Sequence, residues 1–341
     1  MRKFWVRLTQ WEYWPFEFFY TPVFFYFLWL SIKQRSIFFF TSSNPSIDCG
    51  GMFGEKKTDI YSLIPKNYIP NTFLIGVGDG GAALEAARTL GYPLIAKPNI
   101  GERGVWIKKI EREEELLKYV QLCKVEFLLQ ELVEYPLELG VFYVRYPSDY
   151  QGKITSIVRK DFLSVVGNGT QTIRELLLRM DRAVMTVDFD SDFLQEVGDR
   201  VPGIGEKVIV EPIGNHSRGT QFLNDNDKIN PQLSEAIDRL AKEIPDFFYG
   251  RFDLKCQSYE KLAKLEAFTI LELNGAGAEP AHVYQPGYPI WKAYRDILWH
   301  FRVLAEISAE NRKRGHAYWT LKKGVQKWKA YKKYYQLLTA R

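Results

Sequence analysis

Two short segments in the C-terminal half of the chain alternate between apolar and polar residues, and this alternation constrains the fold more than any other feature. Side chains two residues apart in a β-strand share a face, so Glu272 and Asn274 in Leu271–Asn274 point the same way. The segment Arg251–Asp253 has the same pattern, with Asp253 among its polar residues. We therefore expect a mixed α+β protein in which neighbouring strands present one polar cluster.

The residue types in this cluster indicate its chemistry. Carboxylate and amide oxygens are hard ligands that suit Mg²⁺, which proteins hold through one or two carboxylates together with substrate phosphates. Asp253, Glu272 and Asn274 are the predicted metal ligands. Arg251 lies two residues before Asp253, on the same face, where it could stabilise charge on a transferred phosphoryl group.

A lysine followed by a glycine-bounded turn indicates a phosphate site. Residues 93–97 are expected to form a strand that ends at Lys97, and the motif Gly101-Glu102-Arg103-Gly104 follows it. Residues 105–107 are expected to return as a second strand. Backbone N–H groups of such a turn can close over phosphates, with the lysine beneath them. Lys97, Gly101, Glu102 and Gly104 are therefore candidate phosphate-binding residues, although an ordinary hairpin has the same pattern.

The end of a further expected strand, residues 126–132, could hold a nucleoside. Backbone groups of Glu131, Leu132 and Val133 could bind adenine, and Glu138, seven residues after Glu131, could accept hydrogen bonds from ribose hydroxyls. A surface carboxylate is the alternative for Glu138. The sequence Gly-Asn-Gly at 167–169 is, by itself, most typical of a tight turn.

Residues 37–40 are apolar and are expected to form a short buried strand. Periodicity predicts further helices at residues 82–90, 111–122, 172–181 and 231–242. The three cysteines have no CxxC spacing, so the sequence indicates neither a zinc site nor a disulfide framework. Hydrophobic content of 46% and charged content of 26% are typical of a globular protein.

The N-terminal segment is unusually aromatic. Residues 1–40 hold 17 of the 52 Phe, Trp and Tyr residues. The apolar stretch 14–32 contains Glu17 and is interrupted by Pro15 and Pro22, which disfavours a membrane-spanning helix. Its Trp and Tyr content favours a monotopic or re-entrant anchor at the membrane interface. Burial at a dimer or domain interface stays open.

The C-terminal tail is basic. The net charge is +5, yet from Asn311 onward there are ten Lys or Arg residues and no acidic residue. Apolar and aromatic residues recur at helical spacing and are expected to share one face: Leu321, Val325, Trp328, Tyr331, Tyr335 and Leu338. A basic helix of this kind can lie on an anionic membrane leaflet. Packing on its own protein is the alternative, and nucleic acid ranks low because no recognition motif accompanies the tail.

Taken together, the motifs resemble those of ATP-grasp ligases, with spacings most similar to the D-alanine–D-alanine ligase branch. Residues 166–176 and 215–219 resemble segments of cyanophycin-synthetase-like ligases. The resemblance covers roughly residues 50–300 and implies an ATP-grasp fold, in which two α+β subdomains clamp ATP. It identifies Lys97 as the phosphate lysine and Lys57, next to Lys56, as the best match to a second one. It also assigns hinge, ribose and metal roles to the residues named above, namely Glu131, Glu138, Arg251, Asp253, Glu272 and Asn274.

The resemblance implies a two-step reaction with ATP and two Mg²⁺ ions, for which Mn²⁺ can substitute. A carboxylate is phosphorylated to an acyl-phosphate, and an amine then attacks to give an amide, ADP and phosphate. Residues 275–280 depart from the Pro-Gly-Met-Thr-Ser pattern of D-alanine ligases, so the resemblance does not identify the substrates. The expected divisions are an aromatic segment with a reduced N-terminal domain (1–50), a central subdomain (51–135), a C-terminal subdomain (136–305) and a basic helix (306–341).

The leading hypothesis is therefore an ATP-dependent carboxylate–amine ligase on the cytoplasmic side of a membrane, peripheral or monotopic, acting on a hydrophobic or lipid-linked substrate. One alternative is a soluble peptide ligase whose ends form a homodimer. Another is a non-catalytic ATP-binding module. No nucleic-acid partner is expected. His216 and His282 are candidate bases for the amine step, and a structural role is the alternative for each.

Overall fold

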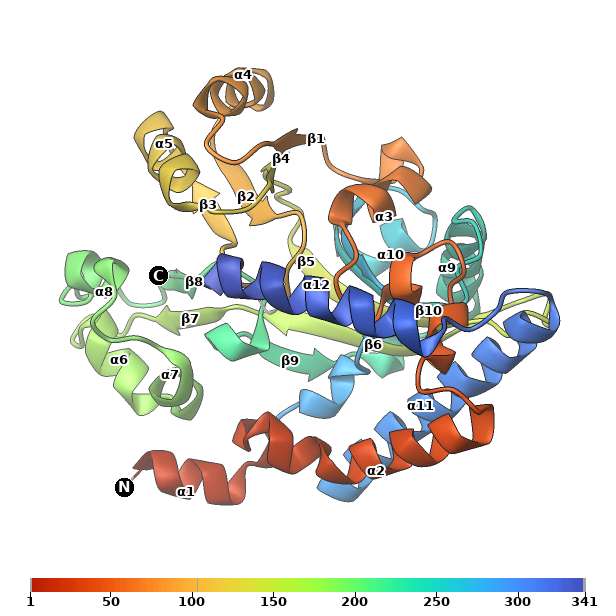
Figure 1. Ribbon diagram of the computed structural model, residues 1–341. Helices are drawn as coiled ribbons and strands as arrows, with labels where there is room; N and C mark the ends of the chain where they lie inside the picture. Colours follow the sequence, from red (N-terminus) through yellow and green to blue (C-terminus); the bar gives the residue numbers. More distant parts are fainter. Residues whose placement is uncertain (1, 103, 340–341) are drawn as a thin grey trace.

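The computed structural model describes residues 2–102 and 104–339, and it contains three antiparallel sheets with helices packed around them (Figure 1). Arg103, part of the glycine-turn motif, lies outside the described residues. The mixed α and β composition agrees with the expected fold class.

The first sheet has the strand order β1-β4-β2-β3 and carries α4 and α5 on one side (Figure 1). The predicted helices at 82–90 and 111–122 and the strands at 93–97 and 126–132 are confirmed within a few residues. Asp79 caps α4 by accepting a hydrogen bond from the backbone N–H of Ala82. The elements are β1 (Thr72–Ile75), α4 (Gly80–Leu90), β2 (Leu94–Pro98), β3 (Lys108–Ile110), α5 (Glu113–Leu122) and β4 (Phe127–Glu131).

The second sheet has the order β11-β10-β5-β6-β9 and is buried on both faces near its centre. Tyr143 of β5 packs into the core beneath α3 and α9, while its neighbour Phe142 packs toward α11. The helix predicted at 231–242 is confirmed as α9. The elements are α3 (Lys57–Leu63), β5 (Leu137–Val144), β6 (Lys153–Asp161), β9 (Gln221–Asn224), α9 (Pro231–Lys242), β10 (Tyr249–Cys256), α10 (Tyr259–Leu262), β11 (Phe268–Asn274) and α11 (Ile290–Lys313).

A third unit projects from the second sheet and has its own small core. Its helix predicted at 172–181 is confirmed as α6, which begins at a capping box between Thr172 and Glu175. The elements are β7 (Leu163–Val166), α6 (Ile173–Arg179), α7 (Asp181–Thr186), α8 (Asp192–Val197) and β8 (Lys207–Glu211).

The aromatic N-terminus forms α1 (Arg2–Thr9), the short turn η1 (Trp11–Tyr13) and α2 (Phe16–Gln34), which lies along α11 (Figure 1). Phe19 and Val23 of α2 are buried against α11, whereas the opposite face remains exposed. Within residues 2–102 and 104–339, no helix combines the length and apolar character needed to cross a membrane.

Two strand predictions are wrong. Residues 37–40 do not form a strand, because the chain turns into the 3₁₀ helix η2 (Phe39–Ser42), which buries Phe39 and Phe40 beside α11. Residues 105–107 form a turn, and β3 begins only at Lys108. Trp106 adopts a φ of 59°, and its indole N–H donates to the carbonyl of Leu338 at 2.7 Å. Apolar residues are thus buried at 39–40 and partly buried at 105–107 without a ladder partner.

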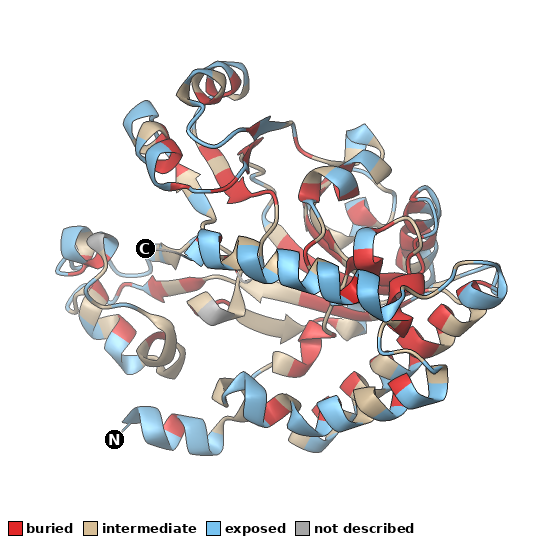
Figure 2. Cartoon of the chain, in the orientation of Figure 1, coloured by how far each residue is buried: buried red, intermediate tan, exposed pale blue. Residues whose placement is uncertain are grey.

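The sequence predicts one apolar and aromatic face for the C-terminal helix α12 (Leu321–Thr339), and only part of that face is buried. Most of α12 is exposed (Figure 2). Leu321, Val325 and Trp328 are exposed, whereas Gly324 and Leu338 are buried. Phe38 packs against Gly324, where any side chain would collide with its ring, and this close approach sets the contact face. The tail therefore packs on its own protein, running from η2 across to the first sheet (Figure 1).

Candidate active site

A cavity of about 850 Å³ is bounded by residues of the first sheet, the second sheet and the N-terminal aromatic segment. All thirteen residues that the sequence predicts for ATP binding, metal binding or charge stabilisation line it. They are Lys57, Lys97, Gly101, Glu102, Gly104, Glu131, Leu132, Val133, Glu138, Arg251, Asp253, Glu272 and Asn274.

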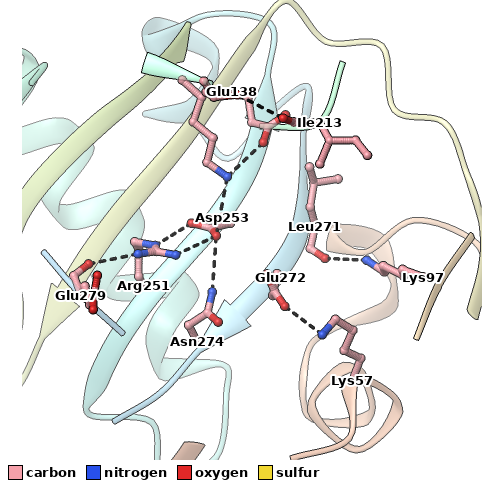
Figure 3. Close-up of polar contacts among 12 residues, drawn as sticks. Lys57, Lys97, Glu138, Ile213, Arg251, Asp253, Leu271, Glu272, Asn274 and Glu279 are labelled. Atoms are coloured by element: carbon pink, nitrogen blue, oxygen red, sulfur yellow. Dashed lines mark hydrogen bonds and ion pairs between the residues drawn. The ribbon is translucent and has the colours of Figure 1, made fainter. Parts of the chain in front are cut away.

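The polar cluster of β10 and β11 has the arrangement that the alternation predicts. Asp253 stands opposite Glu272 and Arg251 opposite Asn274 in the antiparallel register. The Arg251 guanidinium donates to both oxygens of Asp253, at 2.7 and 3.0 Å, and the Asn274 amide donates to Asp253 at 3.4 Å (Figure 3). Gly140 on β5 leaves room for this pair, because a Cβ there would lie 3.1 Å from Arg251 Cδ.

Two lysines approach the cluster from the side of α3 and β2. Lys57 Nζ lies 3.0 Å from a carboxylate oxygen of Glu272 (Figure 3). It also donates to the carbonyl of Gly101 at 2.8 Å. Lys97 Nζ donates to the Tyr61 hydroxyl at 2.8 Å and to the carbonyl of Leu271 at 3.1 Å. Both lysines are buried. Burial lowers the pKa of Lys57, but the Glu272 carboxylate outweighs it and leaves that pKa raised.

Sequence reasoning missed a third lysine. Lys160 of β6 lies between two carboxylates, 3.0 Å from Glu138 and 3.7 Å from Asp253, with its side chain 8% exposed. Its pKa is raised, because the two carboxylates outweigh burial. The sequence around Lys160 carries no signal for this role, because both carboxylates come from other strands.

Charges of both signs meet around the cluster. Four cations (Lys57, Lys97, Lys160 and Arg251) lie among five carboxylates (Glu55, Glu138, Asp253, Glu272 and Glu279). Burial raises the pKa of Asp253 and of Glu272, but Arg251 and Lys57 respectively outweigh it, so both pKa values are lowered. Asp253 and Glu272 are thus ionised at neutral pH, and the converging cations can bind a phosphate group.

These residues fit a magnesium ion that is shared with a phosphate. Over the described part of the chain, no group of three or more His, Cys, Asp and Glu side chains is placed to hold a metal. The cluster instead offers two carboxylates and one amide, from Asp253, Glu272 and Asn274. That donor set matches the usual Mg²⁺ pattern, in which the protein supplies few ligands and the substrate supplies the rest.

The residues predicted to bind the nucleoside begin at the end of β4, where the chain leaves the first sheet. The Glu131 carboxylate accepts hydrogen bonds from the backbone and side-chain amides of Asn71, at 3.0 and 2.8 Å. The carbonyl of Val133 accepts from Lys255 at 2.9 Å. Glu138 is buried and paired with Lys160, so it is not the surface carboxylate of the alternative interpretation.

The glycine turn is tied to the C-terminal helix. The Glu102 carboxylate accepts a hydrogen bond from the Tyr331 hydroxyl at 3.1 Å, and the carbonyl of Gly104 accepts from Arg218 at 2.9 Å. Lys327, one turn before Tyr331, pairs with Asp48. The helix α12 thus joins the turn to the segment that precedes the first sheet.

Three other sequence candidates have different outcomes. Gly167–Gly169 belongs to the third unit and lies outside the cavity, where Asn168 caps a tight turn by accepting from the backbone of Thr170 and Gln171. His216 lines the cavity, and burial lowers its pKa to about 4. His282 lies outside the cavity lining, 3.3 Å from Asp296.

No protein-family model matches the chain. A curated relative is the glutathione biosynthesis bifunctional protein GshAB of Clostridium perfringens, which is 25% identical over 148 residues. That match covers 39% of this chain and 19% of the relative, so the chain spans about a fifth of its length.

Similar solved structures include the VanG D-Ala:D-Ser ligase from Enterococcus faecalis, with 13% identity and a TM-score of 0.42 over 78% of this chain and 64% of that one. The ATP-grasp ligase PsnB, complexed with a minimal precursor, has 14% identity and a TM-score of 0.37 over 75% of this chain and 59% of that one.

Proposed function

We propose that this chain, with its similarity to ATP-grasp ligases, is an ATP-dependent enzyme that joins a carboxylate to an amine. One observation carries the proposal. Four buried or half-buried cations converge with two carboxylates and an amide in a cavity large enough for a nucleotide and a further substrate. Phosphoryl transfer needs this combination, because the protein contributes mainly positioning and charge stabilisation.

Each part of the cavity has a role in the proposal. Residues 131–133 and Glu138 bind the nucleoside, while Lys97, Lys57 and the glycine turn hold the phosphates. Asp253, Glu272 and Asn274 would hold Mg²⁺, which supplies charge neutralisation on the phosphates when it is bound. Arg251 stabilises the charge on the γ-phosphoryl group as it moves. Because Arg251 already contacts Asp253 through two hydrogen bonds, its guanidinium is oriented before substrate arrives.

The proposed reaction has two steps. An oxygen of the substrate carboxylate attacks the γ-phosphorus, the bond to the β–γ bridging oxygen breaks, and ADP leaves. The amine nitrogen then attacks the acyl carbon, the bond to the phosphate oxygen breaks, and inorganic phosphate leaves. The glycine turn and α12 exclude water that would hydrolyse the acyl-phosphate.

The test is ADP release from Mg²⁺–ATP with a panel of carboxylates and amines. We expect ADP release with at least one carboxylate–amine pair. In the double variant Asp253→Asn/Glu272→Gln we expect the rate of ADP release to fall at least 100-fold, since removing charge stabilisation at one site commonly costs that much. Asp190→Asn, an exposed carboxylate of the third unit, is the matched control. Full turnover in the double variant would show that the metal assignment is wrong. Tight ATP binding without ADP release for any pair would favour the non-catalytic module.

A finer proposal concerns where the enzyme works. The outer face of α1 and α2 exposes large apolar side chains, among them Phe18, Phe25, Trp29 and Ile32, at 52–77% exposure. Arg2, Lys3 and Arg7 lie in α1, and Lys33 and Arg35 lie at the end of α2. An aromatic face with basic residues suits the headgroup region of an anionic membrane. This arrangement supports a hydrophobic or lipid-linked substrate.

Flotation with vesicles tests the finer proposal. We expect the protein to float with phosphatidylglycerol-containing vesicles. We expect the double variant Phe25→Glu/Trp29→Glu not to float. Tyr150→Glu, at 92% exposure elsewhere on the surface, is the matched control. If the protein does not float, or if the double variant floats as the wild type does, this face does not bind a membrane. A dimer that dissociates in the same variant would favour the interface alternative.

A further inference from the structure

The cavity contains an aromatic region that the proposed nucleotide and metal residues do not use. We call it the aromatic chamber. Its walls come from η1, α2, the segment between β8 and β9, β9 itself and the segment after β11: Trp11, Tyr13, Tyr20, His216, Phe222 and Tyr284. The chamber adjoins the polar cluster on the side of Arg251, since the carbonyl of Glu279, five residues before Tyr284, accepts from Arg251 at 3.0 Å.

The walls of the chamber are held by packing and by hydrogen bonds. The Trp11 ring stacks on Phe19 with 4.8 Å between ring centroids, and its indole N–H donates to the carbonyl of Tyr288 at 2.6 Å. The Tyr13 ring stacks near His216 at 6.2 Å. Because burial lowers the pKa of His216 to about 4, this ring is neutral at pH 7 and adds no positive charge.

Two carboxylates lie in these surroundings. Glu279 accepts a hydrogen bond from the Tyr284 hydroxyl at 2.9 Å, and that hydroxyl lies 2.9 Å from the hydroxyl of Tyr20. Glu12 lines the cavity as well, and within the described residues its carboxylate has no hydrogen bond or ion pair. Burial raises the pKa of Glu12 to about 7.

The position of Glu279 is fixed by the loop that follows β11. The backbone N–H groups of Ala276 and Gly277 donate to the carbonyls of Gly50 and Gly51, at 2.9 and 2.8 Å. A Cβ on Gly275 would lie 2.5 Å from the carbonyl oxygen of Gly50, so only glycine permits this approach. The loop is therefore held against the N-terminal segment, with Glu279 beside Arg251 (Figure 3).

Carboxylates surrounded by aromatic rings favour a cation with an apolar body. The faces of Trp and Tyr rings attract an ammonium group, and the attraction grows when the site is desolvated. We propose that the aromatic chamber binds the amine substrate as an ammonium against Glu279, with its apolar part on Trp11 and Tyr284, and that Glu279 accepts its proton. The binding claim stands alone, whereas the proton transfer rests on the proposed function.

The ammonium gives one proton to Glu279 and becomes an amine with a free electron pair. That pair attacks the acyl carbon, and the bond to the phosphate oxygen breaks. The second nitrogen-bound proton leaves with the departing phosphate. Glu279 returns its proton to solvent after the amide has left.

The binding test uses three probes of equal shape: phenethylamine, phenethyl alcohol and phenylacetate, titrated calorimetrically at pH 7.5. We expect saturable binding of phenethylamine and no saturable binding of the other two probes. Glu279→Gln keeps the shape of the side chain but removes its charge, and we expect it to weaken that binding at least tenfold. Trp11→Ala tests the aromatic contribution, and we expect it to weaken phenethylamine binding as well. Glu260→Gln, on the exposed surface, is the matched control.

Two outcomes overturn the inference: no saturable phenethylamine binding to the wild-type protein, or unchanged affinity in Glu279→Gln. ATP affinity is measured on every variant, and Glu279→Gln must retain it, which shows that the variant is folded. If phenethylamine binds as expected but the protein neither binds nor consumes ATP, the proposed function fails while the amine site stands. If ATP is consumed and Glu279→Gln changes nothing, only the amine site fails.

Discussion

Replacing Lys160 with methionine tests whether the charges in the cavity are mutually compensated. The change keeps an unbranched side chain, one atom shorter, and removes the cation that lies 3.0 Å from Glu138 and 3.7 Å from Asp253. Removing one partner of a buried pair typically costs about 3–5 kcal/mol. Asp253 keeps its two hydrogen bonds from Arg251, so we expect the lower end of that range, about 3 kcal/mol at pH 7.5.

The pH dependence of this cost has a defined sign. The folded-state pKa of Asp253 is lowered, so its stabilising contribution is present above its unfolded pKa and is lost as the pH falls through its folded pKa. Removing Lys160 raises the folded pKa of Asp253 and reduces that contribution at neutral pH. Lys160 itself has a raised pKa, so its contribution is fully present below its unfolded pKa and does not change between pH 4.5 and 7.5.

The assay is urea unfolding of the wild type and Lys160→Met at pH 7.5 and 4.5. A third measurement is made at pH 3.0. We expect the difference in the free energy of unfolding to be the same at pH 7.5 and 4.5, which both lie above the unfolded pKa of Asp253 (3.8), and to narrow at pH 3.0. Lys153→Met on the same strand is the control, because Lys153 is exposed and should change stability by less than about 0.5 kcal/mol. A difference below about 1 kcal/mol, or one that does not change with pH, would refute the reasoning.

Three further substitutions test other parts of the structure. Gly140→Ala should lower both stability and ATP turnover, by about 1–3 kcal/mol for stability, since its Cβ would lie 2.8 Å from Val158 and 3.1 Å from Arg251; unchanged urea unfolding would contradict this. Asn44→Ala should cost about 3 kcal/mol in the same assay, because the buried Asn44 side chain bonds four backbone groups, at Gly50, Phe248 and Tyr249, and the change leaves them without these bonds. Tyr331→Phe removes the contact with Glu102, so ATP hydrolysis without an acceptor should rise relative to amide formation, with Tyr318→Phe as the control; an unchanged ratio would show that α12 does not restrain the glycine turn.

The sequence predicted the polar cluster because a two-residue period fixes which side chains share a strand face, whatever the surrounding fold. The predicted placement of Glu272, Asn274 and Asp253 depended only on that rule. Lys160 could not be assigned in the same way, because its partners Glu138 and Asp253 come from other strands, and only the sheet order β10-β5-β6 brings the three together.

Segments governed by tertiary contacts were predicted less well. Phe39 and Phe40 are as apolar as a buried strand requires, but they fill space beside α11 from a 3₁₀ turn. In α12 the contact face follows Gly324, where backbone and ring approach closely, rather than the most apolar positions. The aromatic N-terminus was assigned to a membrane or an interface, whereas Trp11 and Tyr20 also line the cavity.

Trapping of an acyl-phosphate tests the central claim most directly. Hydroxylamine is a small neutral nucleophile that converts an acyl-phosphate to a hydroxamate without needing the amine site. With Mg²⁺–ATP, a panel of carboxylates and hydroxylamine, we predict hydroxamate and ADP in equal amounts for at least one carboxylate, and neither product in Lys97→Met. ADP release without hydroxamate for every carboxylate, or equal hydroxamate formation in Lys97→Met, would contradict the proposal that this cavity activates a carboxylate with ATP.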